Sequence, residues 1–318
     1  MREPKLAVVG ATGAVGNQFV ELAATRAFPR GGLRLFASAE RSADTVETEE
    51  GEFEVEELND PGDLRGFDLA VLAVPETQAA EIIRARPGPV LIDLSAAMRP
   101  PSDEPLVAPG LTPRERLSAL RGAAVFAVPH PAAHALATIL SALGIKQAWI
   151  SATLLAGASA GGRNQVAATV EQSADLLSGK LDLKPGEIQC GFNVLIGDPE
   201  RRVASAIRAQ VGALMEGAPE IILQVMSTPI LHGSALAIAV SAPEGSSQWP
   251  ARLKCAPGLL LAEEPSPLGV IDALGREAII VRMESQAGGA SLFCVFDNAR
   301  VAALIAVWIA ENLLLTSQ

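Results

Sequence analysis

The chain has 318 residues, 49% of them hydrophobic, and a formal net charge of −11 at pH 7. Lysine and arginine form no basic stripe, so nucleic acid and anionic membrane surfaces are not expected partners. The length suffices for one large core or two moderate ones. Three irregularly spaced cysteines fit neither a disulfide framework nor a zinc site, which favours a reducing cytoplasm.

No targeting or membrane segment is expected. The N-terminus enters the first predicted strand at once, without a signal peptide. Two uncharged stretches, 122–145 and 221–243, reach membrane-spanning length, but both contain proline and histidine. They are typical of strand–helix and strand–turn–strand units rather than of transmembrane helices.

The first predicted elements are a strand and a helix joined by a glycine turn. Residues 5–16 are Lys-Leu-Ala-Val-Val-Gly-Ala-Thr-Gly-Ala-Val-Gly. In such a turn the first glycine allows the tight bend, the second lets the backbone approach a pyrophosphate, and the third lets helix and strand pack closely. Free N–H groups at the helix start then face the phosphates. The alternative is a glycine turn without a ligand. The expected phosphate-binding residues are Gly10, Thr12, Gly13, Ala14, Val15 and Gly16.

Strands alternate with helices over the first 129 residues. This alternation predicts an α/β fold with a Rossmann-type, doubly wound parallel sheet. The expected strands are 6–9, 33–37, 53–58, 69–74, 90–94 and 125–128, and the expected helices are 15–26, 77–86 and 114–121.

The pattern changes after Pro129, where helices precede strands in succession. Such an order predicts a second, α+β domain with a mostly antiparallel sheet. We expect a final helix at 300–315 to pack on the first domain, which gives a nucleotide-binding domain of residues 1–129 plus 297–318 and a second domain of residues 130–296. The expected elements of the second domain are helices at 131–143, 164–177 and 201–215 and strands at 147–154, 221–227, 235–241, 278–284 and 291–296.

The end of the second strand indicates which dinucleotide binds. Residues 35–42 are Leu-Phe-Ala-Ser-Ala-Glu-Arg-Ser, with no carboxylate at the strand tip to bind a ribose 2′-OH. Ser38, Arg41 and Ser42 supply donors suited to a 2′-phosphate, which favours NADP over NAD. The alternative is that Glu40 binds the ribose and Arg41 is an ordinary solvated charge.

Four segments in chain order resemble aspartate-semialdehyde dehydrogenase, within a superfamily that also holds N-acetyl-glutamyl-phosphate reductase. Residues 10–16 are similar to its opening motif and residues 38–42 to its NADP-phosphate loop. Residues 91–99 resemble the segment in which a serine, here Ser95, lies near the cofactor and an arginine, here Arg99, receives substrate phosphate. Residues 297–300 resemble the last motif, whose asparagine, here Asn298, contacts the nicotinamide end. The resemblance implies an NADP-dependent fold of amino-acid biosynthesis with a dimerisation domain, hence a homodimer.

The catalytic positions of that family are replaced. Its reaction needs a cysteine thiolate at a helix start, where the helix dipole lowers the thiol pKa. The matching segment, 126–134, is Phe-Ala-Val-Pro-His-Pro-Ala-Ala-His, so the nucleophile position falls on Pro131. The family's glutamine falls on Leu155, its substrate-binding arginine on Ser227 and its histidine base on Ser234. The sequence is therefore similar to bacterial paralogues of the family that lack the catalytic cysteine.

One further departure concerns the cofactor itself. In the loop Val74-Pro-Glu76 the family has small, glycine-containing residues. Pro75 lacks an N–H group, which argues against a full set of cofactor contacts there.

Other residues offer less specific chemistry. His130 and His134 have the spacing of a two-histidine metal face, but no third ligand is apparent; the alternatives are a polar residue before a helix and a residue lining a vestigial cleft. His232 would share a face with Ser234 if both lay in a strand. Arg202 and Arg208 join Arg99 in an anion site or are surface charges. Cys190 and Cys294 are expected to be buried, and Cys255 an idle loop thiol.

Three functions remain open on the sequence. The first is a catalytically silent homodimer that binds NADP and acts in sensing or interaction. The second is an oxidoreductase of altered chemistry that uses its histidines or Arg99 on another small acid. The third is a non-catalytic partner subunit of an authentic aspartate-semialdehyde dehydrogenase.

Overall fold

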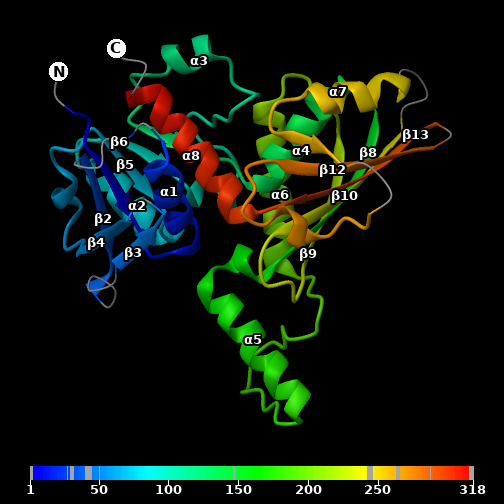
Figure 1. Ribbon diagram of the computed structural model, residues 1–318, viewed down its shortest axis with the longest axis horizontal. Coiled ribbons are helices and arrows are strands. Elements are labelled where there is room, and N and C mark those ends of the chain that lie inside the picture. Colours follow the sequence, from blue (N-terminus) through cyan, green and yellow to red (C-terminus); the bar gives the residue numbers. More distant parts are fainter. Residues whose placement is uncertain are drawn as a thin grey trace. The chain divides into compact units, whose positions relative to one another are not determined.

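The computed structural model of the protein describes residues 3–26, 28, 32–39, 45–49, 51–145, 148–241, 246–262, 266–286 and 288–314. The chain divides into two compact units (Figure 1). The first comprises Met1–His134 and Ala302–Gln318, and the second comprises Ala135–Val301. Helices α4 (Pro131–Leu143) and α8 (Asn298–Leu314) carry the chain across these boundaries. Among the described residues, no helix combines the length and apolarity that a bilayer crossing needs.

The first unit contains a seven-stranded sheet with strand order β3-β4-β2-β1-β5-β6-β7. All its strand pairs are parallel except the edge pair β3–β4. The order reverses at β1, which pairs with both β2 and β5, and this confirms the predicted doubly wound sheet. The strands are β1 (Leu6–Val9), β2 (Leu33–Ala37), β3 (Thr45–Thr48), β4 (Gly51–Glu57), β5 (Leu69–Leu72), β6 (Val90–Asp93) and β7 (Val125–Ala127).

Short helices connect these strands. They include α1 (Ala14–Ala24), α2 (Glu76–Ala85), α3 (Arg114–Ala119) and the 3₁₀ turns η3 (Pro61–Leu64) and η4 (Ser95–Met98). The observed helices lie within two residues of the predicted bounds. The strand β3 was not predicted, because a four-residue edge strand with alternating polar residues carries little hydrophobic signal.

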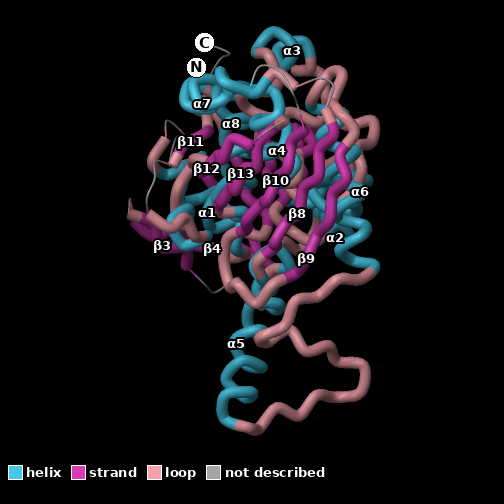
Figure 2. Tube along the Cα trace, turned by 90° about the vertical axis from the view of Figure 1, so that its right-hand side faces the viewer, coloured by secondary structure: helices cyan, strands magenta, loops and turns pink. Residues whose placement is uncertain are grey.

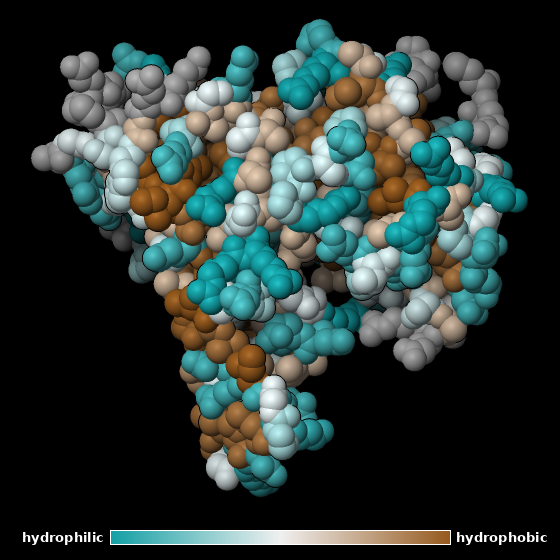
Figure 3. All heavy atoms as spheres, turned by 180° about the vertical axis from the view of Figure 1, so that it is seen from behind, coloured by the Kyte–Doolittle hydropathy of each residue, from teal (hydrophilic) through white to brown (hydrophobic). Residues whose placement is uncertain are grey.

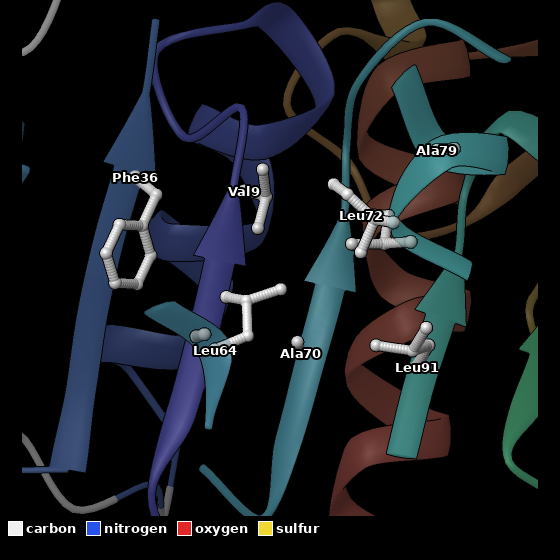
Figure 4. Close-up of a cluster of buried hydrophobic side chains, with 9 residues drawn as sticks. Val9, Phe36, Leu64, Ala70, Leu72, Ala79 and Leu91 are labelled. Carbon is white, nitrogen blue, oxygen red and sulfur yellow. The ribbon is translucent and has the colours of Figure 1, made fainter. Parts of the chain in front are cut away.

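The core of this unit lies on both faces of the central strands. On one face Val9, Phe36 and Leu72 point the same way and pack with Leu64 of η3 and Ala79 of α2 (Figure 4). The alternate residues of the same strands, such as Val8 and Val71, are also fully buried. A sheet covered on both faces explains why its strands are continuous apolar runs rather than alternating ones.

The second unit contains a six-stranded mixed sheet with order β11-β12-β13-β10-β8-β9. The pairs β8–β9 and β11–β12 are parallel and the other three are antiparallel. The predicted, mostly antiparallel character is thus confirmed. Consecutive strands β9 and β10 do not pair with each other, because β8 lies between them. The strands are β8 (Trp149–Ala156), β9 (Ile221–Ser227), β10 (Ser234–Ser241), β11 (Leu259–Leu261), β12 (Ile279–Gln286) and β13 (Gly289–Phe296).

Besides the larger part of α4, the described residues of the second unit form the helices α5 (Arg163–Ser178), α6 (Asp198–Leu214) and α7 (Trp249–Cys255). Figure 2 looks onto one face of the sheet, over which no helix of the described part of this unit lies. Helix α5 and the segment after it form an arm that extends away from the sheet (Figures 1 and 2). Within the arm, Gln172 links α5 to the segment after it, because its Oε1 accepts hydrogen bonds from the backbone N–H groups of Cys190 (2.7 Å) and Gly191 (3.2 Å).

Candidate functional site

The glycine turn lies at the carboxyl end of β1, in the centre of the parallel sheet. The N–H groups of Gly10 and Ala11 both donate to the carbonyl oxygen of Phe36, at 2.8 and 3.2 Å, and so tie the turn to the neighbouring strand β2. Gly10 has a φ of +83°, a backbone conformation that L-residues with a side chain rarely adopt. In doubly wound sheets, ligands bind at this edge, next to the strand where the order reverses.

The three glycines of the turn meet different surroundings. A Cβ atom on Gly10 would lie 2.3 Å from the carbonyl oxygen of Ala73, and one on Gly16 would lie 2.2 Å from the carbonyl oxygen of Gly10. Both contacts are with backbone, so the fold itself requires these two glycines. A Cβ on Gly13 would lie 3.2 Å from the carbonyl oxygen of Gly10, a tighter contact than most Cβ atoms make, and this oxygen would have to shift by a few tenths of an ångström. Close packing within the protein therefore explains Gly10 and Gly16 but does not by itself require Gly13.

The start of α1 presents backbone donors. Gly13 is the N-cap residue, and the first intrahelical bond runs from the Asn17 N–H to the Gly13 carbonyl oxygen at 2.9 Å. The first N–H groups of α1, those of Ala14, Val15 and Gly16, have no partner within the helix. Gly13 has no side chain that could accept a hydrogen bond from them. Such a helix end attracts a phosphate through both the N–H groups and the helix dipole.

Of the residues predicted to bind a 2′-phosphate, the structure describes one. Ser38 is exposed and directly follows β2. Arg41 and Ser42, like Glu40, lie outside the described residues. The choice between NADP and NAD therefore stays a prediction.

The loop after β5 lies against the glycine turn. The N–H of Ala73 donates to the Val9 carbonyl oxygen at 2.8 Å, and the Ala73 carbonyl oxygen faces Gly10. Pro75 is the N-cap residue of α2, with its carbonyl oxygen accepting from the Ala79 N–H at 3.0 Å. An N-cap residue does not use its own N–H in the helix, so a helix start explains this proline.

A buried carboxylate organises the end of β6. Asp93 is fully buried, and its Oδ1 accepts hydrogen bonds from the N–H (2.8 Å) and the hydroxyl (2.7 Å) of Ser95. Its Oδ2 accepts from Nη2 of Arg99 at 3.0 Å, and the same nitrogen lies 3.2 Å from Oε2 of Glu104. The structure thus brings the predicted residues Ser95 and Arg99 together, and adds two acidic partners that the sequence analysis missed. The short separation of Arg99 and Glu104 in the sequence was the available signal for this ion pair. It was not sufficient, because it does not predict the path of the intervening loop.

The position expected for the nucleophile is the first residue of α4. Pro131 begins this helix, and Nδ1 of His130 accepts a hydrogen bond from the Ala132 N–H at 3.0 Å. His130 thus caps the helix, which supports the structural role considered for it. Burial lowers the pKa of His130 and of His134 from 6.5 to about 4, so both are neutral at pH 7. The described residues contain no group of three or more metal-ligating side chains that could hold an ion.

The positions on which the resemblance places the family's other catalytic residues gather at one end of the second sheet. Ala156 of β8 is in register with Ser227 of β9 and Ser234 of β10, and Leu155 precedes it. The Ser227 hydroxyl donates to Oε1 of Glu200 at 2.8 Å. A carboxylate thus stands where the resemblance implies a cationic arginine. Nothing in the sequence pattern marked Glu200, because it lies on α6, 27 residues from Ser227.

One sequence-based expectation in this unit needs correction. His232 was considered as a strand residue on the same face as Ser234, but β10 begins at Ser234 and Gly233 has a φ of +78°. His232 is therefore an exposed turn residue, and strand alternation does not apply to it. Arg202 and Arg208 are exposed on α6, which agrees with surface charge rather than an anion site.

Asn298 begins α8 and is buried. Its Oδ1 accepts a hydrogen bond from the Ser159 hydroxyl at 3.0 Å, which orients the amide group. The preceding residue, Asp297, caps the same helix by accepting from the N–H groups of Ala299 and Arg300.

The cysteines lack the features of a catalytic thiol. Cys294 is buried in β13, and burial raises the pKa of its thiol. Cys190 is buried against Gln172, as expected. Cys255 is exposed at the end of α7 rather than in a loop.

The fold and the glycine turn define a class of dinucleotide-binding protein, and comparisons agree. Residues 5–120 match the family model described as the NAD-binding domain of semialdehyde dehydrogenase. A USG-1 protein homolog of Pseudomonas aeruginosa is 32% identical over 350 residues, covering 99% of both chains. The aspartate-semialdehyde dehydrogenase of Aquifex aeolicus is 29% identical, covering 97% of both chains.

A solved structure shows the same likeness in three dimensions. A probable aspartate-semialdehyde dehydrogenase from Pseudomonas aeruginosa superposes with a TM-score of 0.87 at 28% identity, covering 100% of both chains. The chain belongs to the aspartate-semialdehyde dehydrogenase family.

Proposed function

We propose that this protein binds NADP(H) and does not catalyse the dehydrogenation of aspartate semialdehyde. Its role would be that of a cytoplasmic nucleotide sensor or interaction protein. Binding is argued from Gly13, the one glycine of the turn at which a Cβ would meet no atom closer than 3.0 Å; its φ is −72°. A bound pyrophosphate would fill the space beside it, held by the first N–H groups of α1.

Further residues would hold the rest of the nucleotide. We assign the 2′-phosphate to Ser38, Arg41 and Ser42, since guanidinium and hydroxyl groups suit a phosphate. The Ser95 hydroxyl gives its hydrogen to Asp93, so it has lone pairs left to accept from a carboxamide N–H. Asn298, oriented by Ser159, would offer its amide N–H groups to the nicotinamide end. When bound, NADP would supply hydride transfer; the residues named here only bind and orient it.

The loss of catalysis is argued from α4. A proline at the first helical position has no side chain that can attack an aldehyde, and the adjacent His130 is committed to capping the helix. The negatively charged Glu200 beside Ser227 would also repel a substrate carboxylate rather than attract it.

The test is a titration of the full chain with NADPH and NADH, followed by nicotinamide fluorescence and calorimetry. We expect NADPH to bind at least about tenfold more tightly than NADH, because a charged hydrogen bond to the 2′-phosphate contributes about 1.5–3 kcal/mol. Arg41→Met should remove most of that preference. No binding of either nucleotide at millimolar concentration would contradict the proposal.

The loss of catalysis has its own test. A mixture of aspartate semialdehyde, phosphate and NADP should give no reduced nicotinamide. Turnover by the wild-type chain that Arg99→Met abolishes would contradict the loss of catalysis.

A second proposal is that the chain forms a homodimer through the open face of the six-stranded sheet. This face carries exposed apolar side chains, among them Trp149 (57% exposed) and Ile222 (50%), and a groove of about 360 Å³ that Thr153, Arg282 and Phe293 help to line. Apolar side chains also gather along the arm that contains α5 (Figure 3); those exposed there are Val170, Leu177, Ile188, Phe192, Val194 and Ile196. Exposed apolar surface of this extent is typical of an interface.

Light scattering after size exclusion should give twice the chain mass of 33.0 kDa. Ile222→Glu should shift the protein towards monomer, because it places a charge in the apolar interface. Ile271→Glu is the matched control: Ile271 is 82% exposed but lies on the 3₁₀ turn η7 (Val270–Ala273), outside the strands. A wild-type monomer would contradict the homodimer. Recovery of a stoichiometric complex with an authentic aspartate-semialdehyde dehydrogenase would favour the partner-subunit function instead.

A further inference from the structure

One nitrogen of Arg99 is shared by two carboxylates. Its Nη2 lies 3.0 Å from Oδ2 of Asp93 and 3.2 Å from Oε2 of Glu104. Nη2 carries two N–H groups, and these two contacts occupy both. The Arg99 side chain is 23% exposed, so the guanidinium is partly accessible to a ligand.

The position of Arg99 is one where a ligand is expected. Strand β6 ends at Asp93, at the same edge of the parallel sheet as the glycine turn. Two strand spacings separate β6 from β1, or roughly 10 Å. An arginine there would bind a phosphate or carboxylate through two parallel N–H···O bonds, which require Nη2 to be available.

The two carboxylates are held to different degrees. The Asp93 side chain is 1% exposed and also accepts two hydrogen bonds from Ser95, so it belongs to the fixed interior. The Glu104 side chain is 24% exposed, lies on a loop after η4 and has the exposed Ser102 hydroxyl as its other partner. Of the two, Glu104 is therefore the carboxylate that can be replaced without disturbing the interior.

We infer that Glu104 is a specificity-determining residue that occupies the anion position of Arg99 and so excludes phosphate from the Arg99 guanidinium. Two carboxylates around one guanidinium leave a net negative charge, which repels a further anion. The inference rests on the anion-binding role that the resemblance implies for Arg99, and it gives a reason for the proposed loss of catalysis. Removing the charge of Glu104, while Asp93 keeps Arg99 in place, should restore anion binding.

The test is the binding of inorganic phosphate to the full chain at constant ionic strength, measured by calorimetry and by the shift in melting temperature. Glu104→Gln should tighten phosphate binding about ten- to hundredfold, the range expected for a charge-assisted hydrogen bond. Arg99→Met in the Glu104→Gln background should abolish the gain. Acetate, titrated in parallel, tells whether the restored site takes carboxylates as well.

The matched control is Glu56→Gln. Glu56 also faces an arginine of the first unit, with Arg34 Nε at 3.7 Å, and its replacement changes the net charge by the same amount. An equal gain in both variants, or none in Glu104→Gln, would overturn the inference. Glu104→Ala, expected to show the same gain, serves if the glutamine variant is poorly folded. Binding of NADPH to the wild-type chain is measured separately. A wild-type chain that binds NADPH, together with a Glu104→Gln variant that gains no phosphate binding, would overturn this inference alone and leave the proposed function standing.

Discussion

Replacing Gly16 with alanine is expected to lower the free energy of unfolding by about 3 kcal/mol or more, because the new Cβ would overlap backbone that cannot move aside. The nearest atoms are the carbonyl oxygen of Gly10 at 2.2 Å and Cα of Ala11 at 2.9 Å. Gly10→Ala should be at least as damaging, since it adds the strain of a φ of +83° to a contact of 2.3 Å with Ala73. Urea denaturation followed by circular dichroism measures both effects.

Gly13→Ala is the matched comparison and should behave in the opposite way. Gly13 has a φ of −72° and a ψ of 164°, which alanine adopts without strain. We expect a change in unfolding free energy below about 1 kcal/mol, because the mild contact at 3.2 Å is offset by a less flexible unfolded chain. The added methyl group would instead occupy the space of the pyrophosphate, so NADPH binding should weaken at least about tenfold.

The pair of measurements separates folding from binding. A stable Gly13→Ala protein that binds NADPH as tightly as the wild type would show that no pyrophosphate approaches this turn. A Gly16→Ala protein as stable as the wild type would contradict the close contact between strand and helix. The combination we expect, an unstable Gly16 variant and a stable but non-binding Gly13 variant, is difficult to explain with a ligand-free glycine turn.

Acidification from pH 7 to pH 4 is expected to destabilise the protein through its two buried histidines. The pKa of His130 and of His134 is about 4 in the folded protein, against 6.5 in the unfolded chain, because burial disfavours the charged imidazolium. The unfolded chain therefore binds protons more tightly. The contribution of each buried, neutral histidine to the free energy of unfolding is fully present above pH 6.5. It is lost as the pH falls from 6.5 through 4, by about 3 kcal/mol for each histidine.

Variants of the two histidines should differ at neutral pH. Nδ1 of His134 is buried and has no hydrogen-bond partner among the described residues, so His134→Leu should be neutral or stabilising at pH 7 and should reduce the loss on acidification. His130→Leu removes the cap on the Ala132 N–H and should cost about 1 kcal/mol at pH 7, whereas His130→Asn keeps an acceptor.

His232 supplies the control, since it is the only other histidine of the chain and is exposed. His232→Asn is therefore measured beside the other variants as the exposed-histidine comparison. The measurement is the free energy of unfolding from denaturant titrations at pH 7, 6, 5 and 4 (roughly the interval between the two pKa values). A flat profile in the wild type, or an unchanged slope in His134→Leu, would contradict the assignment.

Much of the fold could be predicted because its signals are local. The strands β1 and β2, the helix α4 and the strand β9 have the predicted bounds, since each is a short apolar run or amphipathic segment bordered by glycine, proline or polar residues. No predicted element covered β11 or α7. A three-residue edge strand and a seven-residue helix are too short for their periodicity to be distinguished from that of a loop.

The candidate site was predictable only in part. The glycine turn is contiguous in sequence, so its geometry follows from the order of its residues. Strand pairing was not predictable in the same way: β9 precedes β10 in the chain, yet β8 separates them and brings Leu155, Ser227 and Ser234 together. The position of His232 was missed because Gly233, with its positive φ, ends the alternation that a strand would impose.

By itself the sequence determined a doubly wound nucleotide-binding domain and a second mixed domain, and it predicted that Pro131 stands where the resemblance implies a catalytic cysteine. These are properties of residue order and of short-range periodicity. Only the tertiary structure decided that Arg99 is shared by Asp93 and Glu104, that Glu200 stands beside Ser227, and that Gly13 differs from its two neighbouring glycines. Each of these depends on which atoms meet after the chain has folded, because electrostatic pairing and steric contact are set by distance in space and not by separation in sequence.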